Sequence, residues 1–242
     1  FPAIYQMLTE MDAKIKAIRS LLYETGRFVD LYKTYQEVGG HRKLKPEERK
    51  EAEACQKTAD VFTPLIKLMG SEYCNQIAYD SLQIHGGSGF MKDYPIERIY
   101  RDARITTIYE GTSQLQVVAA IRGITTGLFV KRIKEVYQQA ETRPELDYLM
   151  RKLGRMTDAF EEAYHKVSQE KEADYLDFHA RRLVEMVGNI IMGYLLVLDA
   201  ERNDEYTQHA DIFIKHAAAE NDKHSSYIAN FAYKDLGPFK KA

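Results

Sequence analysis

The carboxylate of Glu110 stands in a sequence context where acid–base chemistry is possible. It precedes Gly111 and two residues that cap helices well, Thr112 and Ser113, and it follows the apolar connector 105–108. In one interpretation Glu110 is a helix-end acid that the helix macrodipole stabilises. In the other it is held in an apolar pocket, where desolvation favours proton uptake and strengthens it as a general base. The local sequence leaves both interpretations open.

A cluster of glycines forms a second segment that could bind a ligand. Gly86, Gly87 and Gly89 lie within four residues, in the run Gln83-Ile84-His85-Gly86-Gly87-Ser88-Gly89-Phe90. Glycines adopt positive φ angles and let other groups approach the backbone, and amides at a helix terminus bind anions. An anionic cofactor could therefore contact the backbone here. In the alternative interpretation Gly86 and Gly87 only end a helix, and the glycines by themselves leave both interpretations open.

The segments that must position these residues have the spacing of amphipathic helices. A first apolar stripe predicts a helix that reaches to about Tyr35, and it consists of Ile4, Leu8, Met11, Ile15, Ile18 and Leu22. Gly39-Gly40 and the charged run from His41 to Glu53 predict a loop, within which Pro46 is suited to the first position of the next helix.

Further along the chain, turn and capping residues divide the helical segments. Pro64 should kink or end the second helix, and Ser71 should cap the segment that follows. A short helix should begin near Pro95 and end before Arg104, because the β-branched run 105–108 favours an extended connector. Thr112 or Ser113 should then cap another helix.

The chain beyond Gly127 keeps the helical spacing to its end, and a last helix is expected over about Glu205 to Ala232. Two apolar stripes comprise Leu146, Leu149, Leu153, Met156, Phe160, Ala163 and Val167, and then Leu183, Val187, Ile190, Ile191, Tyr194 and Leu198. With Pro144 near the junction, we divide the chain into a four-helix bundle over residues 1–130 and a helical extension over 131–242. The predicted fold class is all-α, an up-down helical bundle followed by the extension.

Composition narrows the classes of partner. The chain has 242 residues, of which 45% are hydrophobic, and it carries 34 basic against 36 acidic residues without a block of one sign. This balance provides no electrostatic footprint for nucleic acid. Cys55 and Cys74 are far apart, so we expect both to be buried apolar residues in a reducing compartment. The location we expect for the protein is the cytoplasm or, in a eukaryote, the mitochondrial matrix.

Two further expectations concern membranes and targeting. The longest apolar stretch, Val187 to Leu198, is about a dozen residues and contains Asn189, which is shorter than the roughly 20 residues that a bilayer requires. We therefore expect no membrane span. The chain opens at Phe1 without a basic region followed by an apolar one, so we expect no secretory signal and interpret the sequence as a piece of a longer protein.

Histidines provide little support for a metal site. His209 and His216 lie seven residues apart on one expected helix, with Asp211 close by, but the spacing of ligands at i,i+3 or i,i+4 is missing. We expect surface histidines and no metal. Arg101 and Asp102 could contact a cofactor, but a neighbouring ion pair at the end of a short helix explains them at least as well, so they are not assigned to the site.

Several short motifs occur in a fixed order at fitting intervals. Gln-x-x-Gly-Gly-x-Gly-Phe begins at Gln83, Tyr-Pro follows at Tyr94, Arg-Asp at Arg101, and Tyr-Glu-Gly-Thr-Ser-Gln at Tyr109. Together they resemble the C-terminal signature of acyl-CoA dehydrogenases, over about residues 1–126. The extension after Gly127 resembles only those members that carry an additional helical tail.

This resemblance implies roles for individual residues. Glu110 occupies the position of the catalytic base that removes an α proton from an acyl-CoA thioester, while the β carbon transfers a hydride to FAD. Some family members place the base on another helix and have no acid here. Tyr109 would line the acyl pocket and Gly111 would lie beside the thioester. Residues implied to contact FAD are Gln83, Ile84, His85, Gly86, Gly87, Thr112, Ser113 and Gln114.

The resemblance also implies partners. The flavin would be held mostly by a neighbouring subunit, so a homo-oligomer, a dimer or a tetramer, is expected, and an electron-transfer flavoprotein would take up the electrons. Most contacts to the flavin ring belong to domains that these residues do not include. The alternative is a non-catalytic oligomerisation or binding module that retains the fold, and the intact Glu110 argues against it.

Overall fold

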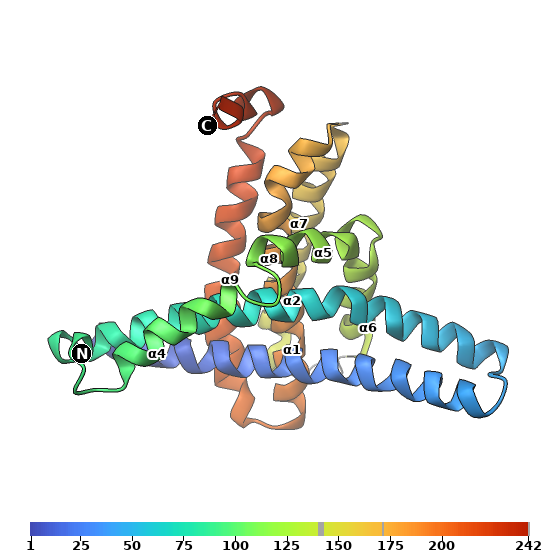
Figure 1. The fold of residues 1–242 in the computed structure, drawn as a ribbon, viewed down its shortest axis with the longest axis horizontal. Coiled ribbons are helices and arrows are strands. Elements are labelled where there is room, and N and C mark those ends of the chain that lie inside the picture. Colours follow the sequence, from blue (N-terminus) through green and yellow to red (C-terminus); the bar gives the residue numbers. More distant parts are fainter. Residues whose placement is uncertain (140–142, 171, 242) are drawn as a thin grey trace. The chain divides into compact units, whose positions relative to one another are not determined.

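The computed structural model describes residues 1–139, 143–170 and 172–241 (Figure 1). Within these ranges the chain forms α-helices joined by turns and short 3₁₀ helices, and it contains no β-strand. The predicted all-α fold class is therefore confirmed. Contacts between residues divide the chain into two compact units. The first comprises Phe1–Met7 and Ile18–Leu128, and the second comprises Leu8–Ala17 and Phe129–Ala242. The domain boundary near residue 130 stays a prediction.

The two long helices of the first unit are α1 (Pro2–His41) and α2 (Pro46–Ile84). The predicted loop from Gly39 to Glu53 is wrong, because α1 includes both glycines and only residues 42–45 connect the helices. The connection is short because its residues are tied to both helices. Arg42 donates its backbone N–H to Val38 O at 3.0 Å, and its guanidinium contacts the Glu48 carboxylate at 2.7 Å. Pro46 is the first residue of α2, as predicted.

Helix α2 continues through Pro64, so of the two predicted effects, a kink or an end of the helix, the end is wrong. A proline inside a helix costs about 3 kcal/mol, mainly because one backbone hydrogen bond is lost. Phe62, Leu65 and Leu68 around it are fully buried, and each such side chain contributes about 1.5–3 kcal/mol. Burial therefore outweighs the local penalty. Ser71 caps nothing, contrary to the prediction, since its hydroxyl donates to Leu68 O within the helix at 3.1 Å.

Short helices follow α2: α3 (Gly87–Phe90), α4 (Ile96–Ala103) and, after the 3₁₀ turn η1 (Arg104–Thr107), α5 (Ser113–Thr125). Helix α4 starts after Pro95 and ends before Arg104, as predicted. The extended conformation predicted for 105–108 is wrong. Thr106 Oγ1 donates to Ala103 O at 2.7 Å and Asn75 Nδ2 donates to the same carbonyl at 2.9 Å, so side chains satisfy the end of α4 and continue the chain as a tight turn.

The second unit contains α6 (Leu128–Gln139) apart from its first residue, η2 (Pro144–Leu146), α7 (Asp147–Gln169), α8 (Ala173–Arg202), α9 (Glu205–Ala229), η3 (Tyr233–Leu236) and η4 (Phe239–Lys241). Helices α7, α8 and α9 pack pairwise against one another. Every residue of the two predicted apolar stripes is buried, which confirms the helical spacing in this half. The last helix ends at Ala229 rather than at the expected Ala232.

The residues Leu8–Ala17 of α1 belong to the second unit, and two of them lie beside histidines of α9. His209 Nε2 lies 2.8 Å from Asp12 Oδ2, and His216 Nδ1 lies 3.9 Å from Glu10 Oε2. Both histidines are partly buried and lie beside carboxylates of α1, so the expectation of surface histidines holds for them only in part. His209 and His216 are seven residues apart and therefore lie on the same face of α9, as expected from the sequence. This face of α9 contacts the Leu8–Ala17 segment of α1.

Among the described helices, α8 is long and apolar enough to cross a membrane by length and composition, which the apolar run 187–198 alone does not show. In the structure 89% of its most apolar window is buried. Because α7 and α9 pack against α8, burial inside the helical bundle accounts for its apolar composition. Asn189, within the window, donates from Nδ2 to Asn221 Oδ1 at 2.9 Å, so its polar group is satisfied inside the bundle.

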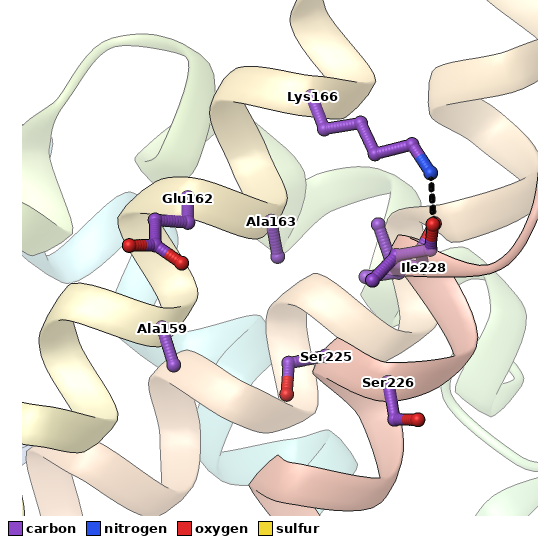
Figure 2. Close-up of a pocket in the computed structure, with 8 residues that line it drawn as sticks. Ala159, Glu162, Ala163, Lys166, Ser225, Ser226 and Ile228 are labelled. Carbon is purple, nitrogen blue, oxygen red and sulfur yellow. Dashed lines mark hydrogen bonds between the residues drawn. The ribbon is translucent and has the colours of Figure 1, made fainter.

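A groove lies between α7 and α9 and has a volume of about 360 Å³ (Figure 2). Lys166 of α7 crosses its end and donates to Ile228 O at 2.8 Å and to Ala229 O at 2.6 Å. These are the last carbonyls of α9, which have no partner within the helix, so the lysine caps α9. The other residues that line the groove are Ala159, Glu162, Ala163, Ser225 and Ser226, and none of them belongs to the predicted site.

The two cysteines differ in environment. Cys55 is buried on α2, as expected, whereas Cys74 on the same helix is exposed, so the expectation for Cys74 is wrong. Helix α2 buries one face only, and Cys74 falls outside it.

Candidate functional site

The glycine cluster forms the turn between α2 and α3 in the first unit. Gly86 has φ +60°, and its N–H donates to Gln83 O at 3.0 Å. This conformation favours glycine and ends α2, as one of the two interpretations predicted. A Cβ on Gly86 or Gly87 would meet no other atom within 4 Å, whereas a Cβ on Gly89 would lie 2.7 Å from Leu82 O. The space beside the first two glycines is therefore open to a ligand, and the third glycine serves packing.

The predicted ligand contacts on this turn are mostly accessible. Gln83, His85, Gly86 and Gly87 are exposed, and Ile84 is half-buried. His85 Nδ1 lies 2.7 Å from Ser81 O, and its ring contacts that of Tyr94 edge-on at 6.4 Å between centroids. The histidine ring is thus held against the helix that precedes it and against the segment that leads into α4.

Glu110 lies in a strained turn between η1 and α5. Its φ is +52°, and no other residue among those described, glycines apart, has a positive φ. Gly111 follows with φ +92°. A left-handed non-glycine residue costs about 1–3 kcal/mol and is typical of functional sites. The Glu110 side chain is exposed. The described residues therefore fix the backbone of Glu110, but they do not bury its carboxylate.

The amide of Gln116 holds this turn from the side of α5. Gln116 Nε2 donates to Glu110 O and to Gly111 O, each at 3.2 Å. A Cβ on residue 111 would lie 2.7 Å from the same nitrogen, so glycine at this position leaves room for the amide. The sequence prediction did not include Gln116. The sequence feature that could have indicated Gln116 is a polar side chain in the first turn of the helix that Thr112 was predicted to cap.

Helix α5 begins as predicted, with Thr112 as its cap. Thr112 Oγ1 accepts a hydrogen bond from Leu115 N at 3.4 Å. The next residue, Ser113, is buried, and its hydroxyl donates to Glu72 Oε1 at 2.6 Å. This bond fixes the start of α5 to α2. Of the three residues here implied to contact FAD, Gln114 is exposed and Thr112 is half-buried, whereas the Ser113 hydroxyl is committed to Glu72.

Lys67 supports the other side of the turn, and sequence reasoning missed it as well. Its Nζ donates to Thr106 O and lies 4.4 Å from the centre of the Tyr109 ring. The cation–π contact orients a ring whose outer part remains exposed. The residue before Glu110, Tyr109, thus has a positive charge over its ring.

Large apolar side chains are exposed throughout this part of the first unit. They are Tyr79, Phe90, Met91, Tyr94, Ile99, Tyr100, Ile105, Ile108, Tyr109, Leu115 and Val118. Where exposed apolar side chains form a contiguous surface, that surface is usually one that other protein or a ligand covers.

A metal centre has no support in the described part of the chain. No three His, Cys, Asp or Glu side chains converge there in a way that would hold an ion. Arg101 and Asp102, which were not assigned to the site, are both exposed on α4.

Two family models match the chain in succession. The model of the "Acyl-CoA dehydrogenase, C-terminal domain" covers residues 46–125, and the model "Acyl-CoA dehydrogenase C terminal" covers residues 125–236. The second match lies on the extension, which the motifs alone had assigned only to members with a helical tail.

Curated relatives match over part of their length. The caffeyl-CoA reductase-Etf complex subunit CarC of Acetobacterium woodii is 34% identical over 132 residues, which are 54% of this chain and 27% of that protein. The broad-specificity linear acyl-CoA dehydrogenase FadE5 of Mycobacterium tuberculosis is 35% identical over 115 residues, 48% of this chain and 17% of that protein. The chain thus spans about a quarter or less of these relatives.

Solved structures show the same fold. An acyl-CoA dehydrogenase complexed with FAD from Bacillus anthracis covers 94% of this chain with a TM-score of 0.69 at 24% identity, and 42% of that protein is matched. Caenorhabditis elegans ACDH-11 in complex with C11-CoA covers 90% with a TM-score of 0.70 at 20% identity, and 36% of it is matched. From its motifs, the two successive family models and this fold, the chain belongs to the acyl-CoA dehydrogenase family, as a C-terminal helical part.

Proposed function

We propose that this chain is the C-terminal part of an FAD-dependent enzyme that oxidises an acyl-CoA thioester to the enoyl-CoA, with Glu110 as the catalytic base. The observation that carries the proposal is the turn at Glu110, where the family motif Tyr-Glu-Gly-Thr-Ser-Gln coincides with a left-handed glutamate. A glutamate that served only as a helix-end charge would need no such conformation.

The residues fit a dinucleotide cofactor. Gly86 and Gly87 leave open space beside the backbone at the end of α2, and Gln83 and His85 are accessible at the same turn. Gly86, Gly87 and their neighbours would contact FAD, and Thr112 and Gln114 would contact it from the start of α5. When bound, FAD supplies the acceptor for the hydride that leaves the β carbon.

The chain's own part in the reaction is to hold and accept a proton. Glu110 would take the α proton of the thioester at its carboxylate, so that the substrate loses one proton to the protein and one hydride to the cofactor. Gly111 would lie beside the thioester and Tyr109 would line the acyl pocket. A base for such a weak acid must be poorly solvated. Because Glu110 is exposed in this chain, the substrate and the remaining parts of the enzyme would provide that enclosure.

Assembly and electron transfer complete the proposal. The exposed apolar side chains of the first unit support a homo-oligomer, a dimer or a tetramer, in which a neighbouring subunit shares the FAD site. An electron-transfer flavoprotein would receive the electrons, and the relative named as a subunit of a reductase-Etf complex supports this partner. A reducing compartment, the cytoplasm or the mitochondrial matrix, is proposed as the location.

Reduction of an enoyl-CoA is a second candidate, which the match to a caffeyl-CoA reductase favours. The same site would run in reverse, with the Glu110 carboxyl returning a proton to the α carbon. The third possibility, a binding module without catalysis, shares the fold but needs no strained glutamate.

A spectrum of the complete protein distinguishes these functions. Under anaerobic conditions, bleaching of the oxidised flavin by acyl-CoA supports the dehydrogenase. Reoxidation of the chemically reduced flavin by an enoyl-CoA, without bleaching by acyl-CoA, supports the reductase. A flavin that responds to neither, or a protein that contains no flavin, would contradict the proposed function and support the binding module.

A further inference from the structure

We propose that Gln116 is a positioning residue, which sets the direction of the Glu110 carboxylate by holding the backbone of its turn. This inference rests on the proposed role of Glu110 as the base. Gln116 lies on α5, and its contacts with the turn are made to backbone atoms rather than to the reacting group.

The contact between Gln116 and the turn consists of two hydrogen bonds from one side-chain nitrogen. Nε2 carries two hydrogens and donates to Glu110 O and Gly111 O, both at 3.2 Å. These carbonyls belong to the two consecutive residues with positive φ. The amide therefore bridges the peptide units that define the left-handed turn.

The glycine after the base makes this bridge possible. A Cβ at residue 111 would lie 2.7 Å from Gln116 Nε2, closer than non-bonded atoms approach. Gly111 and Gln116 thus form a matched pair, in which the missing side chain of one provides the space for the amide of the other.

The left-handed conformation of Glu110 is strained, so it persists only while the surrounding contacts hold it. From φ +52°, relaxation to the ordinary helical region is a rotation of roughly 115° about the N–Cα bond. Such a rotation moves the Cα–Cβ bond, and with it the carboxylate, away from its direction. Proton abstraction depends on the distance and angle between base and proton, so loss of the bridge should slow the chemical step.

The other supports of the turn do not replace this bridge. Lys67 acts on Thr106 O and the Tyr109 ring, and Ser113 fixes the start of α5 to Glu72. These contacts fix the residues before and after the turn. The hydrogen bonds to the carbonyls of Glu110 and Gly111 come from Gln116.

The test uses the complete holoenzyme and two variants at this position. Gln116→Met keeps the length of the side chain but has no donor, and Gln116→Asn keeps the amide but is one methylene too short to bridge the carbonyls. Gln56→Met is the matched control, since Gln56 is exposed on α2. In stopped-flow experiments at saturating acyl-CoA, both Gln116 variants should reduce the flavin about five- to tenfold more slowly, the scale of a lost hydrogen bond. Flavin content should be unchanged, and Gln56→Met should match wild type.

A double-mutant cycle separates positioning from general damage to the fold. In a Glu110→Gln background there is no base left to position, so Gln116→Met should change the residual rate by less than about twofold. An equal fold-change in both backgrounds, or wild-type rates for both Gln116 variants, would overturn the inference while leaving Glu110 as the base. If Glu110→Gln alone reduced the flavin at the wild-type rate, the proposed function itself would fail, and the role of Gln116 with it.

Discussion

Gly193 in the middle of α8 is the position at which the packing of the second unit is most directly testable. A Cβ at this position would lie 2.5 Å from Leu153 Cδ2 on α7 and 3.3 Å from Ile214 Cγ1 on α9. Both neighbours are fully buried, so neither has free space into which to retreat. Gly193→Ala should therefore force the three helices apart locally.

Two opposing terms determine the net effect of Gly193→Ala on stability. Alanine is favoured over glycine inside a helix by about 1 kcal/mol. Inserting a methyl group into a close-packed core costs about 1–3 kcal/mol, and the contact at 2.5 Å places this site toward the upper end. We therefore expect a net loss of about 1–2 kcal/mol in the free energy of unfolding.

Gly154 on α7 provides the matched control, because a Cβ there would meet no atom within 4 Å. Gly154→Ala should keep the propensity gain and stabilise the protein by up to about 1 kcal/mol. Urea denaturation followed by circular dichroism measures both variants. If Gly193→Ala were stabilised as much as Gly154→Ala, the close packing of α8 against α7 and α9 would be refuted.

Three further outcomes follow from the structure. Burial, together with the positive charges of Arg182 and Lys166, lowers the pKa of His179 from 6.5 to about 4. Between these two pH values the unfolded chain therefore binds a proton at His179 that the folded chain does not. Stability should thus fall by at most about 3 kcal/mol as the pH drops from 6.5 to about 4 and flatten below, and His179→Leu should remove this slope in thermal denaturation measured against pH. The 242-residue chain alone should purify without bound FAD and leave acyl-CoA unoxidised, since it provides only part of the site, and a fully yellow preparation would contradict this. Because the apolar faces of α7 and α8 are buried, the chain should not cosediment with anionic vesicles at physiological salt.

The helices of the second unit were predictable from the sequence because the residues of each predicted apolar stripe are the ones that the structure buries. Leu149, Leu153 and Phe160 repeat at the helical period, and all are fully buried. In the first unit, local signals conflicted with tertiary packing. Pro64 and the Gly39-Gly40 pair are helix breakers in isolation, yet both lie within long helices. Buried side chains surround Pro64, and the Arg42 guanidinium ties the end of α1 to Glu48 of α2.

The site was predictable only in part, for a related reason. Glu110 and the cap at Thr112 are evident from local sequence and motif. Lys67 and Glu72 support the site through contacts between α2 and later segments, and no spacing along the chain encodes these contacts. Gln116 acts locally, on the turn five and six residues before it, but its residue type alone does not specify a bond to that backbone.

The proton transfer assigned to Glu110 is tested most directly by stopped-flow measurement of flavin reduction in the complete Glu110→Gln enzyme. The amide keeps the size of the side chain but accepts no proton, so flavin binding should be nearly unchanged. The rate of flavin reduction by acyl-CoA should fall by at least about a hundred- to ten-thousandfold, the usual contribution of a general base. Bleaching at a rate close to that of wild type would contradict the account and assign the base to another part of the enzyme.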